Sequence, residues 1–239
     1  MDSVAAAADT SSPSSPPPLP PLPPLPGTAG VPDPDPAVVR VPQLAWRSQY
    51  DNIVAMRAGR SAPVDSMGCE RCADPAAPAP DRRFQTLVSL MLSSQTKDEV
   101  TYAACQRLAA TGRFNAAGVA GMSEEEIAAA IYPVGFYRRK AEYVRAAGRA
   151  VMETWHGDIP DTVEGLCSLK GVGPKMAHLA MNAAWDRVVG IGVDTHVHRI
   201  ANRLGWVRST KEPEDTRLAL EAWLPRPLWH TVNLLLVGF

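Results

Sequence analysis

One short segment, residues 169–175, constrains the fold of this chain more than any other, because it must turn the backbone sharply between two apolar helical stretches. Gly171 and Gly173 carry no Cβ, so they permit positive φ and close approach of the backbone. Pro174 has a φ suited to the first position of a new helix. Lys175 then lies in the first turn of that helix, where free N–H groups can hold a phosphate. The segment predicts a tight turn between two helices, with a lysine beside a potential anion site.

Two interpretations of Lys175 are open. In the first, the segment is an ordinary αα-hairpin loop and the lysine is solvated, since short Gly-rich turns are common. In the second, the lysine is a nucleophile: a helix N-terminus and desolvation both disfavour an ammonium there, and a neutral amine can form a Schiff base. Asp194, in the later segment 193–196, supplies a carboxylate at another expected helix start. Its plain alternative is a helix N-cap.

The rest of the chain predicts an all-α fold. Apolar residues recur at helical spacing in the segments 84–92, 100–108, 137–155, 176–183 and 197–204. A capping box begins at Ser123, Thr96 and Asp161 are expected N-caps, and Pro213 is expected to open a later helix. Residues 187–193 come nearest to a strand, but the run is short.

Composition limits the class of protein only broadly. The chain has 239 residues and a net charge of −1, so bulk charge does not indicate a nucleic-acid binder and any basic surface must be local. The four cysteines are too few for a dense disulfide framework, which favours an intracellular, reduced protein. No apolar run reaches the ~20 residues of a membrane span, so no membrane partner is expected.

Residues 1–42 are rich in proline and serine, and they are expected to be a disordered tail. The proline tract 16–26 favours an extended polyproline II conformation without a packed core. Such a tract can bind an SH3 or WW domain, or it can act as a spacer.

Residues 43–80 predict a short amphipathic helix near 44–58, followed by a loop over 59–80. Within the loop, Cys69 and Cys72 form a single C-x-x-C pair. The pair can be half of a zinc site, a redox pair or a structural feature. No second pair or histidine cluster follows, which favours the structural interpretation.

Three motifs carry a resemblance to a known family. Residues 92–98 read LSSQTKD, residues 169–177 read LKGVGPKMA, and residues 193–203 read VDTHVHRIANR. Together and in this order they resemble the endonuclease III family of bifunctional DNA glycosylases, and the eukaryotic endonuclease III-like proteins most of all. The resemblance extends from about residue 43 to the last residue.

The resemblance implies the helix-hairpin-helix DNA glycosylase fold. It places a six-helix domain at residues 81–210, with the helix-hairpin-helix at 166–185. Residues 43–80 and 211–239 would then belong to the domain that carries the iron–sulfur cluster in the family.

The resemblance also implies an activity, namely base-excision repair of oxidised pyrimidines in double-stranded DNA, followed by β-elimination at the abasic site. Lys175 would form the Schiff base, and Asp194 would stabilise positive charge and accept a proton. The presence of both residues favours the bifunctional class over a purine-mismatch relative. A monomer acting in the nucleus and the mitochondrion is implied.

Five further residues would contact DNA in such an enzyme. Gln95 and Phe136 match family positions that fill the gap left when a base is turned out of the duplex. The hairpin residues Gly171, Val172 and Gly173 would contact the backbone. As alternatives, Gln95 is an ordinary loop amide and Phe136 is a core aromatic.

The histidines and cysteines are the remaining candidates for metal or cofactor binding. His196 and His198 are a poor metal pair because residues two apart face different sides of a helix, and His178 is either a pocket residue or a packed one. Most family members bind a [4Fe–4S] cluster through a C-terminal cysteine loop. None of the four cysteines matches that loop, so a truncated chain without cofactor is expected. An inactive or unstable form, acting at most as a DNA- or protein-binding module, therefore stays open.

Overall fold

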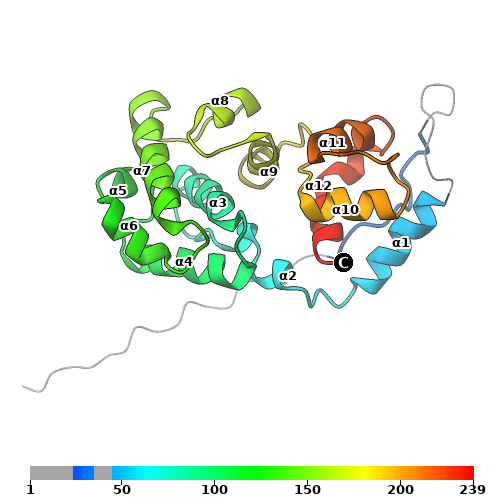
Figure 1. The fold of residues 1–239 in the computed structure, drawn as a ribbon, viewed down its shortest axis with the longest axis horizontal. Coiled ribbons are helices and arrows are strands. Elements are labelled where there is room, and N and C mark those ends of the chain that lie inside the picture. The colour runs from blue at the N-terminus through cyan, green and yellow to red at the C-terminus, as the bar shows by residue number, and fades with distance from the viewer. Residues whose placement is uncertain (1–23, 35–44) are drawn as a thin grey trace, which may run out of the picture.

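The computed structural model describes residues 24–34 and 45–239, in which helices are the regular secondary structure and no strand occurs (Figure 1). The helices are α1 Trp46–Met56, α2 Pro63–Met67, α3 Ala79–Ser93, α4 Asp98–Ala110, α5 Ala116–Ala120, α6 Glu124–Ile131, α7 Tyr137–Thr154, α8 Val163–Ser168, α9 Pro174–Trp185, α10 Thr195–Arg203, α11 Pro213–Glu221 and α12 Trp229–Val237, with 3-10 turns η1 Cys69–Arg71 and η2 Arg226–Leu228. The all-α prediction is confirmed. Among these helices, none has the length and apolar character that crossing a bilayer requires. The predictions for the proline tract fall mostly on residues 1–23, outside the described part.

The helices form two lobes, each around its own apolar core (Figure 1). The first lobe contains α3 to α9, and α9 lies at its inner edge. The second lobe contains α1 and α10 to α12, so it joins the N-terminal part of the chain to the C-terminal part. The C-terminal share of the second core begins at Ile191, whereas the resemblance implied that the six-helix domain ends at residue 210. The domain limits themselves stay a prediction.

Aromatic side chains bind α1 into the second lobe. Trp46 packs edge-on against Trp223, with 5.4 Å between ring centroids, and Tyr50 stacks near Trp206 at 6.1 Å. Large rings bury much apolar area and prefer these offset arrangements. The helix predicted near 44–58 is confirmed, and its partners come from the opposite end of the chain.

Part of the segment expected to be a disordered tail is held against α1. Leu25 is buried in the second core, and Thr28 donates from its N–H and its hydroxyl to the Asp51 carboxylate, at 2.7 and 2.6 Å. Arg47 donates to the carbonyls of Thr28 and Val31. The expectation for residues 1–42 is therefore wrong for residues 25–31, because α1 offers a carboxylate and a guanidinium that satisfy this stretch of backbone.

The segment 59–80 was expected to be a loop, but it contains α2 and η1. Pro63 occupies the first position of α2, and Asp65 accepts a hydrogen bond from the Ala62 N–H at 3.1 Å. Asp65 also binds Arg57 from α1. This partner, eight residues earlier in the chain, stabilises a turn of helix that has little apolar periodicity of its own.

Two of the predicted N-caps are wrong by one residue. Helix α4 begins after Lys97, and the Thr96 hydroxyl instead accepts from the Gly135 N–H at 3.1 Å. Helix α8 is capped by Thr162, and Asp161 pairs with a surface arginine. Ser123 caps α6 as predicted, in a reciprocal capping box. Where two adjacent residues can both cap, the choice depends on what else each side chain can bind.

Candidate active site between the two lobes

The predicted tight turn joins α8 to α9 and places Lys175 in the first turn of α9. Gly171 has φ +86°, and a Cβ there would lie 2.4 Å from the Tyr143 ring, so only glycine fits. Gly173 provides the extended N-cap of α9, and Val172 is buried in the first core. The Lys175 side chain stays 40% exposed. A buried valine thus anchors the turn while the lysine faces outward.

Asp194 divides its two carboxylate oxygens between two tasks. Its Oδ1 accepts from the N–H groups of His196 and Val197, at 2.9 and 2.8 Å, and so caps α10. Its Oδ2 lies 4.0 Å from the Nζ of Lys175. The side chain is only 14% exposed, so the ion pair is partly shielded from water. The cap interpretation and the charge-partner interpretation therefore hold together.

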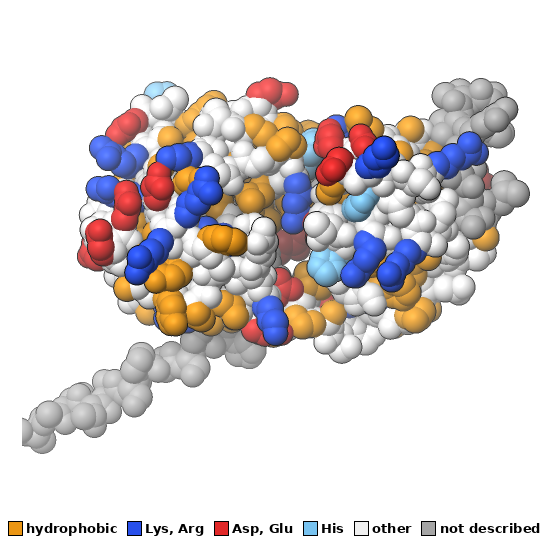
Figure 2. All heavy atoms as spheres, viewed as in Figure 1, with side chains coloured by type: hydrophobic (Ala, Val, Ile, Leu, Met, Phe, Trp, Pro, Cys, Tyr) orange, Lys and Arg blue, Asp and Glu red, His pale blue; other side chains and the backbone are white. Residues whose placement is uncertain are grey.

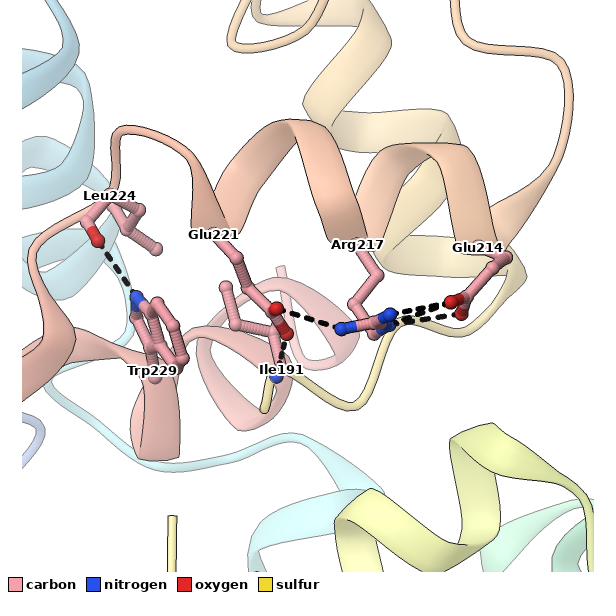
Figure 3. A network of polar contacts seen from close by, with 6 residues as sticks. All are labelled: Ile191, Glu214, Arg217, Glu221, Leu224 and Trp229. Carbon is pink, nitrogen blue, oxygen red and sulfur yellow. Dashed lines mark hydrogen bonds and ion pairs between the residues drawn. The ribbon is translucent and has the colours of Figure 1, made fainter. Parts of the chain in front are cut away.

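Helix α11 holds the loop that leads to Asp194 (Figure 3). Glu221 accepts from the Ile191 N–H at 2.7 Å with one oxygen and from Arg217 at 2.7 Å with the other. Arg217 in turn pairs with Glu214, and the two carboxylates raise the pKa of the guanidinium. From α12, Asn233 donates to a carbonyl of the same loop at 2.6 Å. These contacts place Asp194 opposite Lys175 from the second lobe.

The first of the three motifs, residues 92–98, contributes a second carboxylate in the first lobe. Asp98 opens α4, and burial raises its pKa, with further upward contributions from Glu99 and Asp194. The charges of His196 and Lys175 oppose this rise in the pKa of Asp98. The only feature of the sequence that points to Asp98 is its place in the first of the three motifs. The geometry of the site remains that of Lys175 on α9 and Asp194 before α10.

The histidines take structural positions. His178 is buried on α9, and a Cβ at Gly190 would lie 2.6 Å from its ring, so the packed alternative holds. Burial lowers the pKa of His178. His198 hydrogen-bonds Thr216 at 2.6 Å, as expected for a hydrogen-bonding residue.

Gln95 and Phe136 lie together on the exposed surface of the first lobe. Both have positive φ, 51° and 55°, and Phe136 is 66% exposed. The alternative that Phe136 is a core aromatic is therefore excluded. The two residues line a pocket of about 360 Å³ together with Met91, Ser94, Arg139, Lys140, Tyr143 and Gly171.

The cysteines do not fit an iron–sulfur cluster. Burial raises the pKa of Cys69 to about 12, and a hydrogen bond with Cys72 together with burial raises the pKa of Cys105. Thiols held in the protonated form are poor ligands, since a cluster needs thiolates. Over residues 24–34 and 45–239, no group of three or more Cys, His, Asp or Glu side chains is placed to hold a metal. The C-x-x-C pair is therefore part of the first core.

Known proteins match both the sequence and the fold. Residues 88–226 match the HhH-GPD superfamily of base excision DNA repair proteins. Endonuclease III-like protein 1 of Bos taurus is 55% identical over 195 residues, which cover 81% of this chain and 64% of that protein. The endonuclease III homolog of Encephalitozoon cuniculi is 44% identical over 202 residues, covering 80% and 83%. A solved non-covalent endonuclease III–DNA complex shares the fold with a TM-score of 0.67 and 24% identity, covering 82% of this chain and 85% of that one.

The family match over residues 88–226, together with the two-lobed helical fold, places the chain in a class of base excision DNA repair proteins. The chain belongs to the HhH-GPD superfamily and, within it, to the endonuclease III family. It spans 64% of the length of the bovine relative. Members of this family usually bind a [4Fe–4S] cluster.

Proposed function

We propose that this chain is a bifunctional DNA glycosylase and abasic-site lyase that removes oxidised pyrimidines from double-stranded DNA. One observation carries the proposal: the Lys175 Nζ lies 4.0 Å from the Asp194 Oδ2, at the junction of the lobes. Membership of the endonuclease III family supports it. The two residues are the nucleophile and the carboxylate that the chemistry requires.

The reaction proceeds in two stages at Lys175. The neutral amine attacks the sugar C1′, the bond from C1′ to the base breaks, and the base leaves with the bonding electrons and takes up a proton. The resulting amine loses a proton and the sugar ring opens, which gives a Schiff base between Nζ and C1′. Loss of a C2′ proton then expels the 3′ phosphate by β-elimination. Asp194 stabilises the positive charge that develops at the sugar and assists proton removal from Nζ.

The DNA would lie across the junction of the lobes. Figure 2 shows this junction as a hollow with acidic side chains inside and basic side chains at its upper and lower ends. Basic groups hold phosphates, whereas the interior must receive an uncharged base. We propose that Gln95 and Phe136 fill the space left by the displaced base, and that the hairpin residues 171–173 contact the DNA backbone. A monomer is sufficient for this arrangement.

Borohydride trapping tests the proposed function. The chain is incubated with a duplex that carries one oxidised thymine or one abasic site, and the Schiff base is reduced to a stable amine. A covalent protein–DNA band is expected, with the DNA mapped to the peptide that contains Lys175. The Lys175→Ala variant is expected to give no band.

Absence of a band with the natural chain, when circular dichroism shows that it is folded, would contradict the proposed function. The chain would then be at most a DNA- or protein-binding module. A band that persists in Lys175→Ala would show that another amine is the nucleophile.

We also propose that the four cysteines hold no iron–sulfur cluster, since in the described residues they form no group placed to bind a metal, and burial raises the pKa of the thiols packed in the first core. Purified protein is expected to show no visible absorbance band at about 400 nm, where bound clusters absorb. A brown protein whose iron and sulfide contents match a cluster would refute this. Measurement of iron content distinguishes a cluster from a coloured impurity.

The proposed substrate, DNA, indicates the cellular location. A DNA repair enzyme must reach genomic DNA, so the nucleus and the mitochondrion are the proposed compartments. Two relatives from Arabidopsis thaliana are named as chloroplastic, which supports action on organellar DNA in the family. An SH3- or WW-type partner for the proline tract is also a proposal, and it depends on residues outside the described part.

A further inference from the structure

Lys140, on α7, is a buried cation bonded to neutral oxygens. It is 7% exposed, and its Nζ donates to the carbonyls of Leu92 and Ser94, at 2.7 and 2.6 Å, and to the Thr96 hydroxyl at 3.2 Å. In the described part of the chain it forms no ion pair, and burial lowers its pKa to about 8. A buried charge bonded only to neutral groups lowers stability relative to an apolar side chain. A role other than stability therefore accounts for its presence.

All three acceptors of Lys140 lie at the end of α3 or just after it, around Gln95. Lys140 itself lies four residues after Phe136, on the helix that this phenylalanine caps. One ammonium therefore connects the segment that presents Gln95 to the helix that presents Phe136.

A second set of contacts joins the same two segments. The Gly135 N–H donates to the Thr96 hydroxyl at 3.1 Å, and a Cβ at Gly135 would lie 2.7 Å from the Gln95 carbonyl oxygen. The backbones are therefore packed so closely that only glycine fits at position 135. Thr96 also donates to the Ser94 carbonyl at 3.2 Å, so its hydroxyl is shared by both segments.

The backbone conformations that these contacts hold are uncommon. Gln95 and Phe136 both have φ in the left-handed region, which non-glycine residues seldom adopt. Such conformations persist when the surrounding structure over-determines them, and they cluster at functional sites. Both side chains extend from this strained backbone to the surface, at the mouth of the same pocket.

We propose that Lys140 is a positioning residue that locks Gln95 and Phe136 into one rigid unit, so that both side chains enter the duplex together as the base is displaced. This inference rests on the proposed function. Lys140 lies in the first lobe and its three bonds go to the segment around Gln95, so it acts on displacement of the base and leaves the chemistry at Lys175 alone.

The test compares Lys140→Met on two substrates, a duplex that carries one oxidised thymine and a single strand that carries one abasic site. In the single strand the sugar is already accessible and no base pair has to open. For the duplex, the rate of borohydride trapping is expected to fall about 100-fold, the loss typical of a misplacement of about 1 Å. For the single strand it is expected to change less than about twofold. Lys211→Met, at an exposed lysine on the second lobe, is the matched control and is expected to behave as the natural chain.

A second readout follows base displacement directly. A 2-aminopurine placed opposite or beside the lesion becomes fluorescent when it is unstacked, and Lys140→Met is expected to reduce that signal at saturating protein. A purely structural role would lower the folded fraction and reduce all signals equally. The ratio of duplex to single-strand trapping separates these two cases.

Thr96 provides an independent pair of variants if Lys140→Met does not fold. Thr96→Val removes the shared hydroxyl, and Thr96→Ser keeps it. Thr96→Val is expected to lose duplex trapping selectively, and Thr96→Ser to lose far less.

Equal losses on both substrates, or no loss on the duplex, would overturn the role of Lys140. Failure of the natural chain on both substrates would instead count against the proposed function, so the two failures are distinguishable.

Discussion

Asp194→Asn is expected to slow base excision about 100- to 10,000-fold while leaving the free energy of unfolding nearly unchanged. The two oxygens of Asp194 explain why these effects separate. Oδ1 caps α10, and an asparagine oxygen caps about as well as an aspartate oxygen. Oδ2 faces Lys175, and an amide there carries no negative charge and cannot accept the proton. Single-turnover kinetics on an oxidised-thymine duplex and urea melts measure the two effects.

Asp194→Ala is the companion variant. It removes the cap as well, so it is expected to lose about 1 kcal/mol of stability in addition to activity. If Asp194→Asn excised bases at the rate of the natural chain, the carboxylate would have no catalytic part. If it unfolded as readily as Asp194→Ala, the division of the two oxygens would be wrong.

Arg57→Met is expected to lower the free energy of unfolding by about 3–5 kcal/mol, because it leaves a buried carboxylate without its main partner. Arg57 and Asp65 are joined at 2.6 Å, and their side chains are only 5% and 3% exposed. Arg57 also donates to the Leu234 carbonyl at 3.2 Å, so one guanidinium ties α1 to α2 and to α12. Arg60, 3.4 Å from Asp65, compensates only in part.

An exposed ion pair in the same protein supplies the control. Arg187 and Asp161 lie 3.0 Å apart, but their side chains are 54% and 51% exposed. Arg187→Met is therefore expected to cost less than about 1 kcal/mol. Chemical denaturation of both variants at one pH gives the comparison. Similar losses in the two variants would show that burial does not set the strength of the Arg57–Asp65 pair.

Much of the local structure could be predicted because its signals are local. Pro174 and the glycines before it determine a turn at that point whatever surrounds them, and Ser123 caps α6 through residues three positions away. For the same reason the sequence alone identified Lys175 and Asp194 as candidates, since each stands at the start of a helix with residue types suited to an amine and a carboxylate. The sequence does not give the distance between the Lys175 and Asp194 side chains, which depends on how the two lobes pack.

Only the tertiary structure decided how these local pieces are used. Thr96 has good N-cap chemistry, but contacts with Gly135 and Lys140 engage its hydroxyl instead. Asp98 reads as an ordinary first-turn carboxylate, but burial in the folded chain raises its pKa.

Lys140, which falls within an amphipathic helix, has no sequence signal for burial. Capping and turn formation depend on neighbours within about four residues, so they can be read from sequence. Burial, pKa and the pairing of charges depend on residues from distant segments, and only the packing of the two lobes brings those segments together.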